Sequence, residues 1–408
     1  MSELSYLEKL LDGVEVEWLP LGEVSALRRG RVMSKGYLTE NFGPYPVYSS
    51  QTANNGKIGS INTFDFDGEY ISWTTDGANA GTVFYRTGKF SITNVCGLIT
   101  LKSKCPLIYK FLFYWLTIEA KKHVYSGMGN PKLMSHQVEN IPVPIPCPDN
   151  PEKSLAIQSE IVRILDKFTA LTAELTAELT AELNMRKKQY NYYRDQLLSF
   201  KEGEVEWKTL GEIGKWYGGG TPSKNKIEFW ENGSIPWISP KDMGRTLVDS
   251  SEDYITEEAV LQSSTKLIPA NSIAIVVRSS ILDKVLPSAL IKVPATLNQD
   301  MKAVIPHENI LVKYIYHMIG SRGSDILRAA KKTGGSVASI DSKKLFSFKI
   351  PVPNINEQQR IVEILDKFDT LTNSITEGLP REIELRQKQY EYYRDLLFSF
   401  PKPETVSN

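Results

Sequence analysis

Length, composition and charge exclude several classes of protein. With 408 residues the chain has room for two or three domains. Its 48 basic and 48 acidic side chains cancel, so binding to nucleic acid would need local basic patches or charge supplied by a partner protein. The three cysteines form no CxxC pair and no even disulfide framework, which favours a reducing compartment. The beginning lacks a signal peptide's apolar core and the most apolar run, 107–118, is too short to cross a bilayer, so we expect a soluble cytoplasmic protein.

Residues 1–150 have the composition of a mixed α/β domain, with strands expected within 44–61 and 68–94 and a helix over 107–123. Loops between these elements contain polar and basic side chains that could reach base edges and phosphates. Any surface loop has a similar composition, so a solvated surface role stays open for each. The candidates for DNA contact are Arg28, Arg29 and Arg31 in a short "ALRRGR" loop, Ser50, Gln51, Asn54 and Asn55 after a "YPVY" strand, and Lys132 and His136 in a glycine-containing loop.

A long helix is expected over 151–201. Asn150 suits the N-cap, Pro151 the first helical position and Glu152 the first turn. Apolar residues then recur every three or four positions. A continuous helix here would be about 75 Å long, more than a compact domain needs. Within it, "LTAELTAELTAEL" at 171–183 spells a tetrad of good helix formers three times.

Residues 202–354 form a second mixed α/β block, with strands expected at 272–280 and 289–294 and a helix over 308–332. Three glycines at 218–220 would let the backbone approach a phosphate closely. We expect Trp73, Trp230 and Trp237 to be core or loop anchors; the alternative is that they are platforms on which bases stack. The DNA-contact candidates of this block are Thr221, Ser223, Lys224, Lys241, Arg278, Ser279, Lys331, Lys332 and Thr333.

The last segment, 355–408, repeats the first long helix. "IVRILDKF" at 161–168 returns as "IVEILDKF" at 361–368, and "KQYNYYRDQLLSF" returns as "KQYEYYRDLLFSF", at the same offset of 200 residues. Asn356 and Glu357 supply a helix start. Gly378 and Pro380, however, stand where the first copy has Glu178 and Thr180, so we predict a kink or break there.

A second repeat flanks each block, because "VEWLPLGEV" from Val16 matches "VEWKTLGEI" from Val205, and "IPVP" occurs at both Ile141 and Ile350. The order is therefore variable block, similar helix, variable block, similar helix, and we expect the two chain ends to lie close together. The simplest arrangement packs the two helices antiparallel as a spacer between the blocks. Alternatively, the leucines bury each helix only against its own domain.

Tyrosine and arginine recur at equivalent ends of the two helices. These residue types are enriched in interfaces, and two equivalent sites suit two copies of one partner. Packing of the helix against its neighbouring domain is an equally good explanation, and both could hold on opposite faces. The residues are Tyr190, Tyr192, Tyr193, Arg194, Tyr390, Tyr392, Tyr393 and Arg394.

Motifs for catalysis are missing from the sequence. "GMGNPK" at 127–132 lacks the second proline and the aromatic residue of an adenine methyltransferase motif, and "GGGT" at 218–221 is no Walker loop. The four histidines stand far from any cysteine pair, so we expect no metal site and no catalytic residues.

The block order, the "IPVP" exit, the stretch from Gly219 to Met243 and above all the TAEL tetrads resemble the specificity subunit of Type I restriction-modification systems, of the IC class, over the whole chain. The resemblance implies two target recognition domains that each read half of a bipartite DNA sequence, separated by two long antiparallel helices that form a coiled-coil-like spacer with pseudo-two-fold symmetry. It also implies two methyltransferase subunits that bind S-adenosylmethionine and methylate adenine N6, joined by restriction subunits; the chain itself has no cofactor.

In that family the number of tetrads is associated with the length of the unspecified gap between half-sites. Four helical residues add about 6 Å, against about 3.4 Å per base pair, so one tetrad could move a half-site by one or two base pairs. Neutral lengthening of the helix would instead leave the gap unchanged. Two other functions stay open: an assembly scaffold whose variable blocks bind proteins, and a stand-alone nucleic-acid enzyme, which the missing catalytic motifs disfavour.

Overall fold

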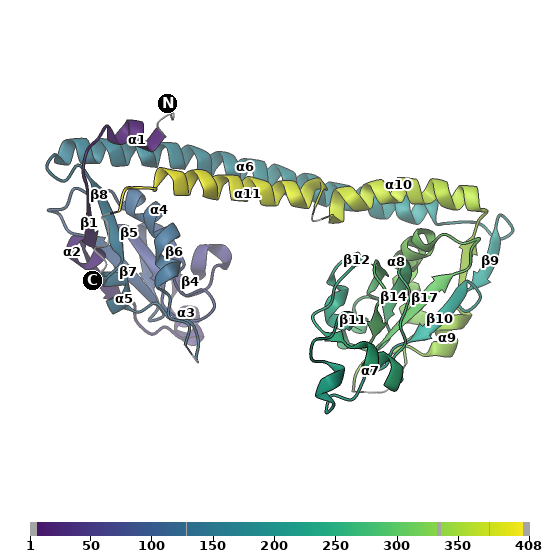
Figure 1. Ribbon diagram of the computed structural model, residues 1–408. Helices are drawn as coiled ribbons and strands as arrows, with labels where there is room; N and C mark the ends of the chain where they lie inside the picture. Colours follow the sequence, from purple (N-terminus) through teal and green to yellow (C-terminus); the bar gives the residue numbers. More distant parts are fainter. Residues whose placement is uncertain (1–5, 128, 333–335, 375, 403–408) are drawn as a thin grey trace. The chain divides into compact units, whose positions relative to one another are not determined.

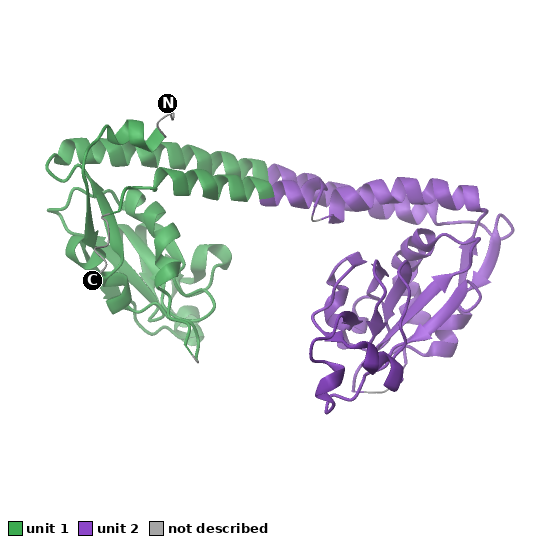
Figure 2. Cartoon of the chain, in the orientation of Figure 1, with its two compact units in different colours: residues 1–176, 385–408 green, residues 177–384 purple. Residues whose placement is uncertain are grey.

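The computed structural model describes residues 6–127, 129–332, 336–374 and 376–402. The chain divides into two compact units, residues 1–176 with 385–408 and residues 177–384 (Figure 2). Each unit contains one variable block and part of each long helix. Figure 1 shows the elements, and no helix among the described residues is long and apolar enough to span a membrane.

The first block is built on a six-stranded sheet with strand order β2-β7-β5-β6-β3-β4. Neighbouring strands pair antiparallel except β3 and β6, which run parallel. The core behind it includes Trp73 and Phe111, both almost fully buried. The elements are α1 (Tyr6–Leu11), β1 (Val16–Pro20), α2 (Leu21–Val24), β2 (Ser25–Arg29), α3 (Lys35–Glu40), β3 (Phe42–Tyr48), η1 (Ala53–Gly56), β4 (Lys57–Ile61), β5 (Phe66–Thr74), β6 (Val83–Ile92), β7 (Cys96–Leu101), α4 (Tyr109–Glu119), η2 (Ala120–His123), α5 (Ser135–Glu139) and β8 (Pro142–Pro146).

The second block has a five-stranded sheet of order β10-β17-β14-β15-β12 and a three-stranded sheet of order β13-β11-β16. Helix α8 packs on the larger sheet and buries Tyr314 and Ile315. The elements are β9 (Glu206–Thr209), β10 (Gly214–Gly218), η3 (Ile227–Phe229), β11 (Ile235–Ile238), η4 (Pro240–Gly244), β12 (Leu247–Val248), β13 (Tyr254–Ile255), α7 (Glu257–Gln262), β14 (Ser272–Val276), η5 (Ser280–Asp283), β15 (Ser288–Ile291), β16 (Thr296–Leu297), β17 (Met301–Pro306), α8 (Val312–Ala330), α9 (Ser342–Ser347) and β18 (Lys349–Val352).

The short repeats at the edges of the blocks pair with each other. β1, which contains the first "VEW", forms an antiparallel ribbon with β8, which contains the first "IPVP". β9 and β18 form the same ribbon in the second unit. In each ribbon the strand at the beginning of a block pairs with the strand at its end. Both blocks are therefore connected to the long helices through equivalent strands.

The first long helix, α6 (Pro151–Leu197), is continuous and runs from the first unit into the second. Asn150 caps it through a 3.0 Å hydrogen bond from the backbone N–H of Lys153, as its sequence predicts. Only one side of the helix near its start is deeply buried, including Ile161 and Leu165. The tetrad leucines are half-buried or exposed, because they lie beyond the block that covers this start.

The second long helix is interrupted, as Gly378 and Pro380 predict. α10 (Ile355–Asn373) ends before α11 (Gly378–Leu397) begins. Gly378 has a φ of 79°, and a Cβ there would lie 2.6 Å from the carbonyl oxygen of Thr370, so only glycine fits. The expected start at Asn356 was wrong: Asn354 caps α10, because its side chain accepts the N–H of Glu357.

Within each unit the two long helices lie side by side and run in opposite directions (Figure 1). In the first unit Phe168 of α6 stacks on Tyr393 of α11, with ring centroids 5.6 Å apart. In the second unit Tyr193 of α6 stacks on Phe368 of α10 at 5.7 Å. The repeated sequences therefore pack on each other, and do more than bury each helix against its own block.

The segments that lead to the two chain ends share one core. Leu7 and Leu11 of α1 belong to the same buried cluster as Leu397 and Phe398. The Trp18 indole also donates to the carbonyl oxygen of Pro401, at 2.9 Å. The ends themselves lie outside the described residues.

Candidate DNA-recognition surfaces and helix junctions

Hydrogen bonds connect several loops of the first block and bring several candidates together. Arg29 donates to the Thr75 hydroxyl at 3.3 Å and to the Asn94 carbonyl at 2.9 Å. Lys132 pairs through its backbone with Asp76, in the loop that follows β5. The Ser50 carbonyl accepts the side-chain amide of Asn79 from that same loop, at 3.1 Å. Arg29, Lys132 and the 49–56 loop thus belong to one connected surface.

Two positional expectations for the first block were wrong, and a third candidate already has side-chain partners. Arg28 and Arg29 lie on strand β2, because the segment pairs with β7 instead of forming a loop. Arg31 is held by Asp65, at 3.0 Å, and by the Tyr37 hydroxyl, so its guanidinium is already engaged. His136 lies on α5, which packs against α2, not in a loop.

The loop between β3 and β4 has an unusual backbone. Asn54 and Asn55 adopt the left-handed conformation, with φ of 50° and 54°, and Gly56 follows with φ of 81°. Asparagine tolerates this conformation better than most residues. Both asparagines are exposed, and Gln51 closes the loop by donating to the Lys57 carbonyl at 2.5 Å. The turn therefore presents two consecutive amides to solvent.

In the second block most candidates gather where β14 ends and β17 begins. Thr221 is hydrogen-bonded to Gln299, and Arg278 lies 3.9 Å from Asp300. Lys331 forms a 2.6 Å ion pair with Asp283. The backbone of Ser279 donates to Ala338 and that of Lys332 donates to Ser339, which tie these segments together. Thr333 lies outside the described residues.

Ser223, Lys224 and Lys241 project from other loops of the same block. Ser223 and Lys224 are exposed, while Lys241 sits on η4 within 3.7 Å of Glu252. The Ser223 carbonyl accepts the Trp230 indole, and the Gly220 carbonyl accepts that of Trp237. The anchoring role expected for the tryptophans is confirmed, since Trp73 is also buried and bonded to Leu133.

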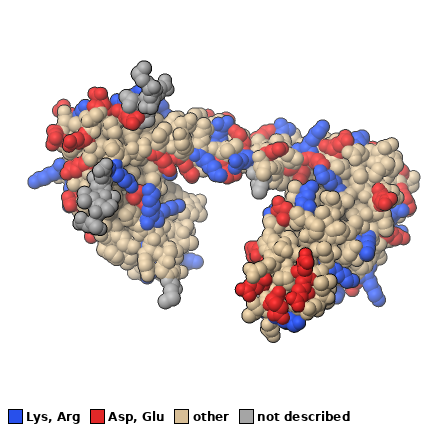
Figure 3. Space-filling model, viewed as in Figure 1, with Lys and Arg blue, Asp and Glu red and all other residues tan. Residues whose placement is uncertain are grey.

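Charge is mixed on both units. On the face drawn in Figure 3, Lys and Arg of the described residues are interspersed with Asp and Glu, without a broad basic patch. Several candidate cations are also paired with carboxylates, as at Arg31 and Lys331. On this face, therefore, basic and acidic side chains offset each other locally, as they do over the whole sequence.

Each block is fixed to the long helices by a junction that the sequence did not reveal. In the first unit Gln158 of α6 is fully buried and accepts the N–H of Ile108, the N-cap of α4, at 2.9 Å. Its amide donates to the Pro106 carbonyl at 2.7 Å. About two helical turns further along α6, Asp166 accepts Lys110 and the Tyr114 hydroxyl, both at 2.7 Å.

The second unit uses the same positions of the repeat. Gln358 of α10 accepts the N–H of Leu311, the N-cap of α8, at 2.9 Å and donates to Pro353 and Asn309. Asp366 accepts Lys313 at 2.5 Å and lies 3.2 Å from His317 Nε2. Burial would raise the pKa of Asp366, but the hydrogen bonds from His317 and Lys313 outweigh it and lower the pKa.

The repeated tyrosines divide into inward and outward members. Tyr190 is hydrogen-bonded to His317 at 3.2 Å, and burial raises its pKa. Tyr390 accepts a hydrogen bond from Thr169 at 3.1 Å. Arg194 and Arg394 pair with the adjacent Asp195 and Asp395. By contrast, Tyr192 and Tyr392 keep 62% and 64% of their surface exposed, so they are the members free to meet another molecule.

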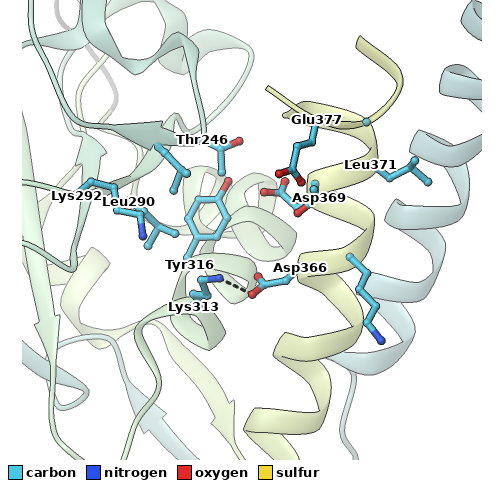
Figure 4. Close-up of a pocket in the computed structure, with 13 residues that line it drawn as sticks. Thr246, Leu290, Lys292, Lys313, Tyr316, Asp366, Asp369, Leu371 and Glu377 are labelled. Carbon is cyan, nitrogen blue, oxygen red and sulfur yellow. Dashed lines mark hydrogen bonds and ion pairs between the residues drawn. The ribbon is translucent and has the colours of Figure 1, made fainter. Parts of the chain in front are cut away.

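A cavity of about 550 Å³ lies beside the junction of the second unit, where the helix is interrupted. Figure 4 shows Lys313 and Asp366 at one side, with Tyr316, Asp369 and Glu377 pointing toward the hollow. Burial raises the pKa of Tyr316 to about 12. The break between α10 and α11 thus leaves a polar hollow that several ionisable groups line.

Comparison with known proteins agrees with this two-part architecture. Residues 13–185 and 202–385 each match the Type I restriction modification DNA specificity domain. The Type I restriction enzyme EcoR124I/EcoR124II specificity subunit of Escherichia coli is 71% identical over 430 residues, covering 100% of both chains. The Type I restriction enzyme EcoprrI specificity subunit of the same species is 38% identical over 92% of this chain and 93% of the relative.

A solved structure that describes complex assembly and conformational transition of the type I R-M system has the same fold. Its TM-score is 0.60 at 15% identity, over 94% of this chain and 98% of that chain. The two domain matches cover most of the sequence, and each contains one variable block with its helix. The chain belongs to the Type I restriction modification DNA specificity family.

Proposed function

We propose that this chain is the specificity subunit of a Type I restriction-modification complex. It reads a bipartite DNA target with two recognition domains and positions two adenine-N6 methyltransferase subunits over it, to which restriction subunits bind. The observation that carries the proposal is the duplicated junction: Gln158 with Asp166, and Gln358 with Asp366, hold two different blocks on equivalent positions of one repeated helix.

Different segments of the chain have different roles. Residues 1–150 and 202–354 are the recognition domains, and 151–201 and 355–408 are the spacer helices. We assign the chain to the IC class on its three TAEL tetrads. The continuity of α6 through those tetrads supports their use as a ruler, because an added tetrad lengthens a single helix.

The DNA-contacting surfaces are the loop clusters of the two domains. In the first, we assign base contact to the exposed amides of Asn54 and Asn55, which suit adenine, and phosphate contact to Arg29 and Lys132. In the second domain, we assign the corresponding base and phosphate contacts to Thr221, Arg278 and Lys332. The mixed charge of both surfaces leads us to expect weak binding by the isolated chain, with partner subunits supplying further phosphate contacts.

Two methyltransferase subunits dock on equivalent outer faces of the spacer helices. Tyr192 and Tyr392 support this assignment, because they are exposed at the same position of each repeat. The methyltransferases bind S-adenosylmethionine and perform the chemistry; this chain contributes recognition alone. We place the complex in the cytoplasm, where the family's DNA substrate and methyl donor are found.

The test is co-expression with a methyltransferase subunit, followed by mapping of methylated adenines across a genome. A bipartite motif with two fixed half-sites and an unspecified gap is expected. A stable complex that methylates no defined motif would contradict the proposal.

A further inference from the structure

Arg86 of strand β6 is buried beneath the loop that presents Asn54 and Asn55. Only 3% of its surface is exposed. Its Nη1 donates to the carbonyl oxygen of Asn55 at 2.8 Å, and its Nε donates to the Ser72 hydroxyl on β5 at 3.0 Å. The guanidinium therefore connects the central sheet directly to the backbone of the turn.

Aromatic rings surround the same guanidinium. Its central carbon lies 3.6 Å from the ring centroid of Tyr48 and 4.5 Å from that of Phe84. Tyr48 is the last residue of β3, immediately before the loop. Stacking on this ring fixes the plane of the guanidinium, which a lysine ammonium could not reproduce.

No carboxylate forms an ion pair with Arg86 among the described residues. Burial lowers its pKa to about 10, so the group stays charged at neutral pH. A buried charge without a counter-ion is costly unless hydrogen bonds and its surroundings compensate for it. Here the carbonyl of Asn55 and the rings of Tyr48 and Phe84 compensate for the buried charge. The stability of the charged guanidinium therefore depends on one conformation of the loop.

The loop, in turn, is shaped to receive Arg86. Gly56 has a φ of 81°, and a Cβ at this residue would lie 3.1 Å from Arg86 Nη2 and 3.2 Å from the Gln51 carbonyl. Asn54 and Asn55 both have positive φ, which costs free energy unless contacts elsewhere hold the turn. The hydrogen bond from Arg86 to Asn55 is such a contact.

We propose that Arg86 is a specificity-determining positioning residue of the first recognition domain: it holds the left-handed Asn54–Asn55 turn in the one conformation that reads its half-site. Arg86 does not touch DNA; it acts through the turn. The inference rests on the proposed function, because the turn must contact bases. It also predicts that the effect is confined to one half-site, since the second domain has its own loops.

The experiment maps methylated adenines for the complex containing Arg86→Lys or Arg86→Met, with Lys89→Met as the matched control. Lys89 is an exposed cation on the same strand, outside the loop contacts. Both Arg86 variants should lose preference at one half-site, with about tenfold slower methylation of the original sequence and acceptance of other bases there. The other half-site and the gap should stay as in the wild type.

Relaxed selectivity at one half-site only is a result that a purely structural role would not give. Unchanged preference at both half-sites in the two Arg86 variants would overturn the inference. So would equal loss at both half-sites in folded variants, because it would show that Arg86 acts on assembly. If the wild-type complex gives no bipartite motif, the proposed function itself fails, which is a distinct outcome.

Should both Arg86 variants fail to fold, Gly56→Ala decides the question. This change leaves Arg86 in place but pushes a Cβ against its Nη2 and strains a positive φ. A folded Gly56→Ala complex should relax the same half-site. Full selectivity in that variant would count against the turn as the reading element.

Discussion

The two junctions between block and helix use the same residues on one side and different residues on the other. Gln158 accepts the N–H of the N-cap residue of α4, and Gln358 accepts the N–H of the N-cap residue of α8. Asp166 and Asp366 both accept a lysine from that helix, but the next partner is Tyr114 in one unit and His317 in the other.

That difference extends to the repeated tyrosines. In the first unit Tyr114 reaches Thr169, which donates to Tyr390. In the second unit His317 lies directly against Tyr190. The repeated helix therefore supplies the same glutamine and aspartate in both units. Each variable block contacts the aspartate with a lysine and, four residues later, with either a tyrosine hydroxyl or a histidine imidazole. These contacts constrain each block where it meets the helix and leave the distant loops free to vary.

The largest change is expected from a deletion that spares both junctions. Removing Thr180 to Leu183 takes one tetrad from α6 and leaves Gln158, Asp166, Gln358 and Asp366 untouched. The gap of the target should shorten by one or two base pairs, and methylation at the original spacing should fall about a thousandfold, because several base contacts are lost together. Methylome mapping would show it.

Substitution of Ala181 by Ser within the same tetrad is the matched control and should leave the motif unchanged. A deletion variant that methylates the original motif with an unchanged gap would show that the tetrads are not a ruler. If the deletion variant still recognises both half-sites, the two junctions hold their blocks independently of the spacer length.

The buried glutamines should matter equally in both units. Gln158→Leu and Gln358→Leu each leave a helix N–H and a carbonyl unsatisfied, at a cost of about 3 kcal/mol in the free energy of unfolding. Urea unfolding measures it. Gln359→Leu, on the exposed face beside Gln358, should cost less than about 0.5 kcal/mol. Unequal losses in the free energy of unfolding for Gln158→Leu and Gln358→Leu would show that the two junctions are not equivalent.

The carboxylate of the second junction makes stability depend on pH. The pKa of Asp366 is lowered in the folded protein, so its contribution is present above the unfolded pKa, about 4, and is lost as pH falls through the folded value. Asp366→Asn should cost about 1 kcal/mol at pH 7, since the side chain is partly exposed, and the deficit should shrink at acid pH.

Thermal unfolding of Asp366→Asn and wild type between pH 7 and pH 3 would test this. Glu363→Gln, an exposed position on the same helix, serves as the control. A deficit that stays constant down to pH 3 would mean that Asp366 is not charged in the junction.

The smallest effect on stability is expected at the outward tyrosines. Tyr192→Ala and Tyr392→Ala should change the free energy of unfolding by less than about 0.5 kcal/mol, yet weaken methyltransferase binding about tenfold at one site each. Titration of the subunit with methyltransferase measures the affinity. Tyr193→Ala, which removes the stacking on Phe368, should instead destabilise the second unit by about 1 kcal/mol. Unaltered affinity in both outward variants would place the partner elsewhere.

Local signals in the sequence predicted the elements that depend on local physics. The Asn150–Pro151 start, the leucine spacing of α6 and the break at Gly378 follow from capping, periodicity and backbone geometry within a few residues. Wrong assignments occurred where tertiary contacts override such signals. Arg28 and Arg29 resembled a loop because pairing with β7 cannot be read from the segment alone.

By itself, then, the sequence determined the order of blocks and helices, the repeat and the family, because these depend only on the order of residues along the chain. Only the tertiary structure decided which side chains meet. It placed Lys110 and Tyr114 on Asp166, Lys313 on Asp366, and Arg86 under Asn55. These partners are far apart along the chain, and no local pattern encodes a hydrogen bond that forms only once two separate elements have packed.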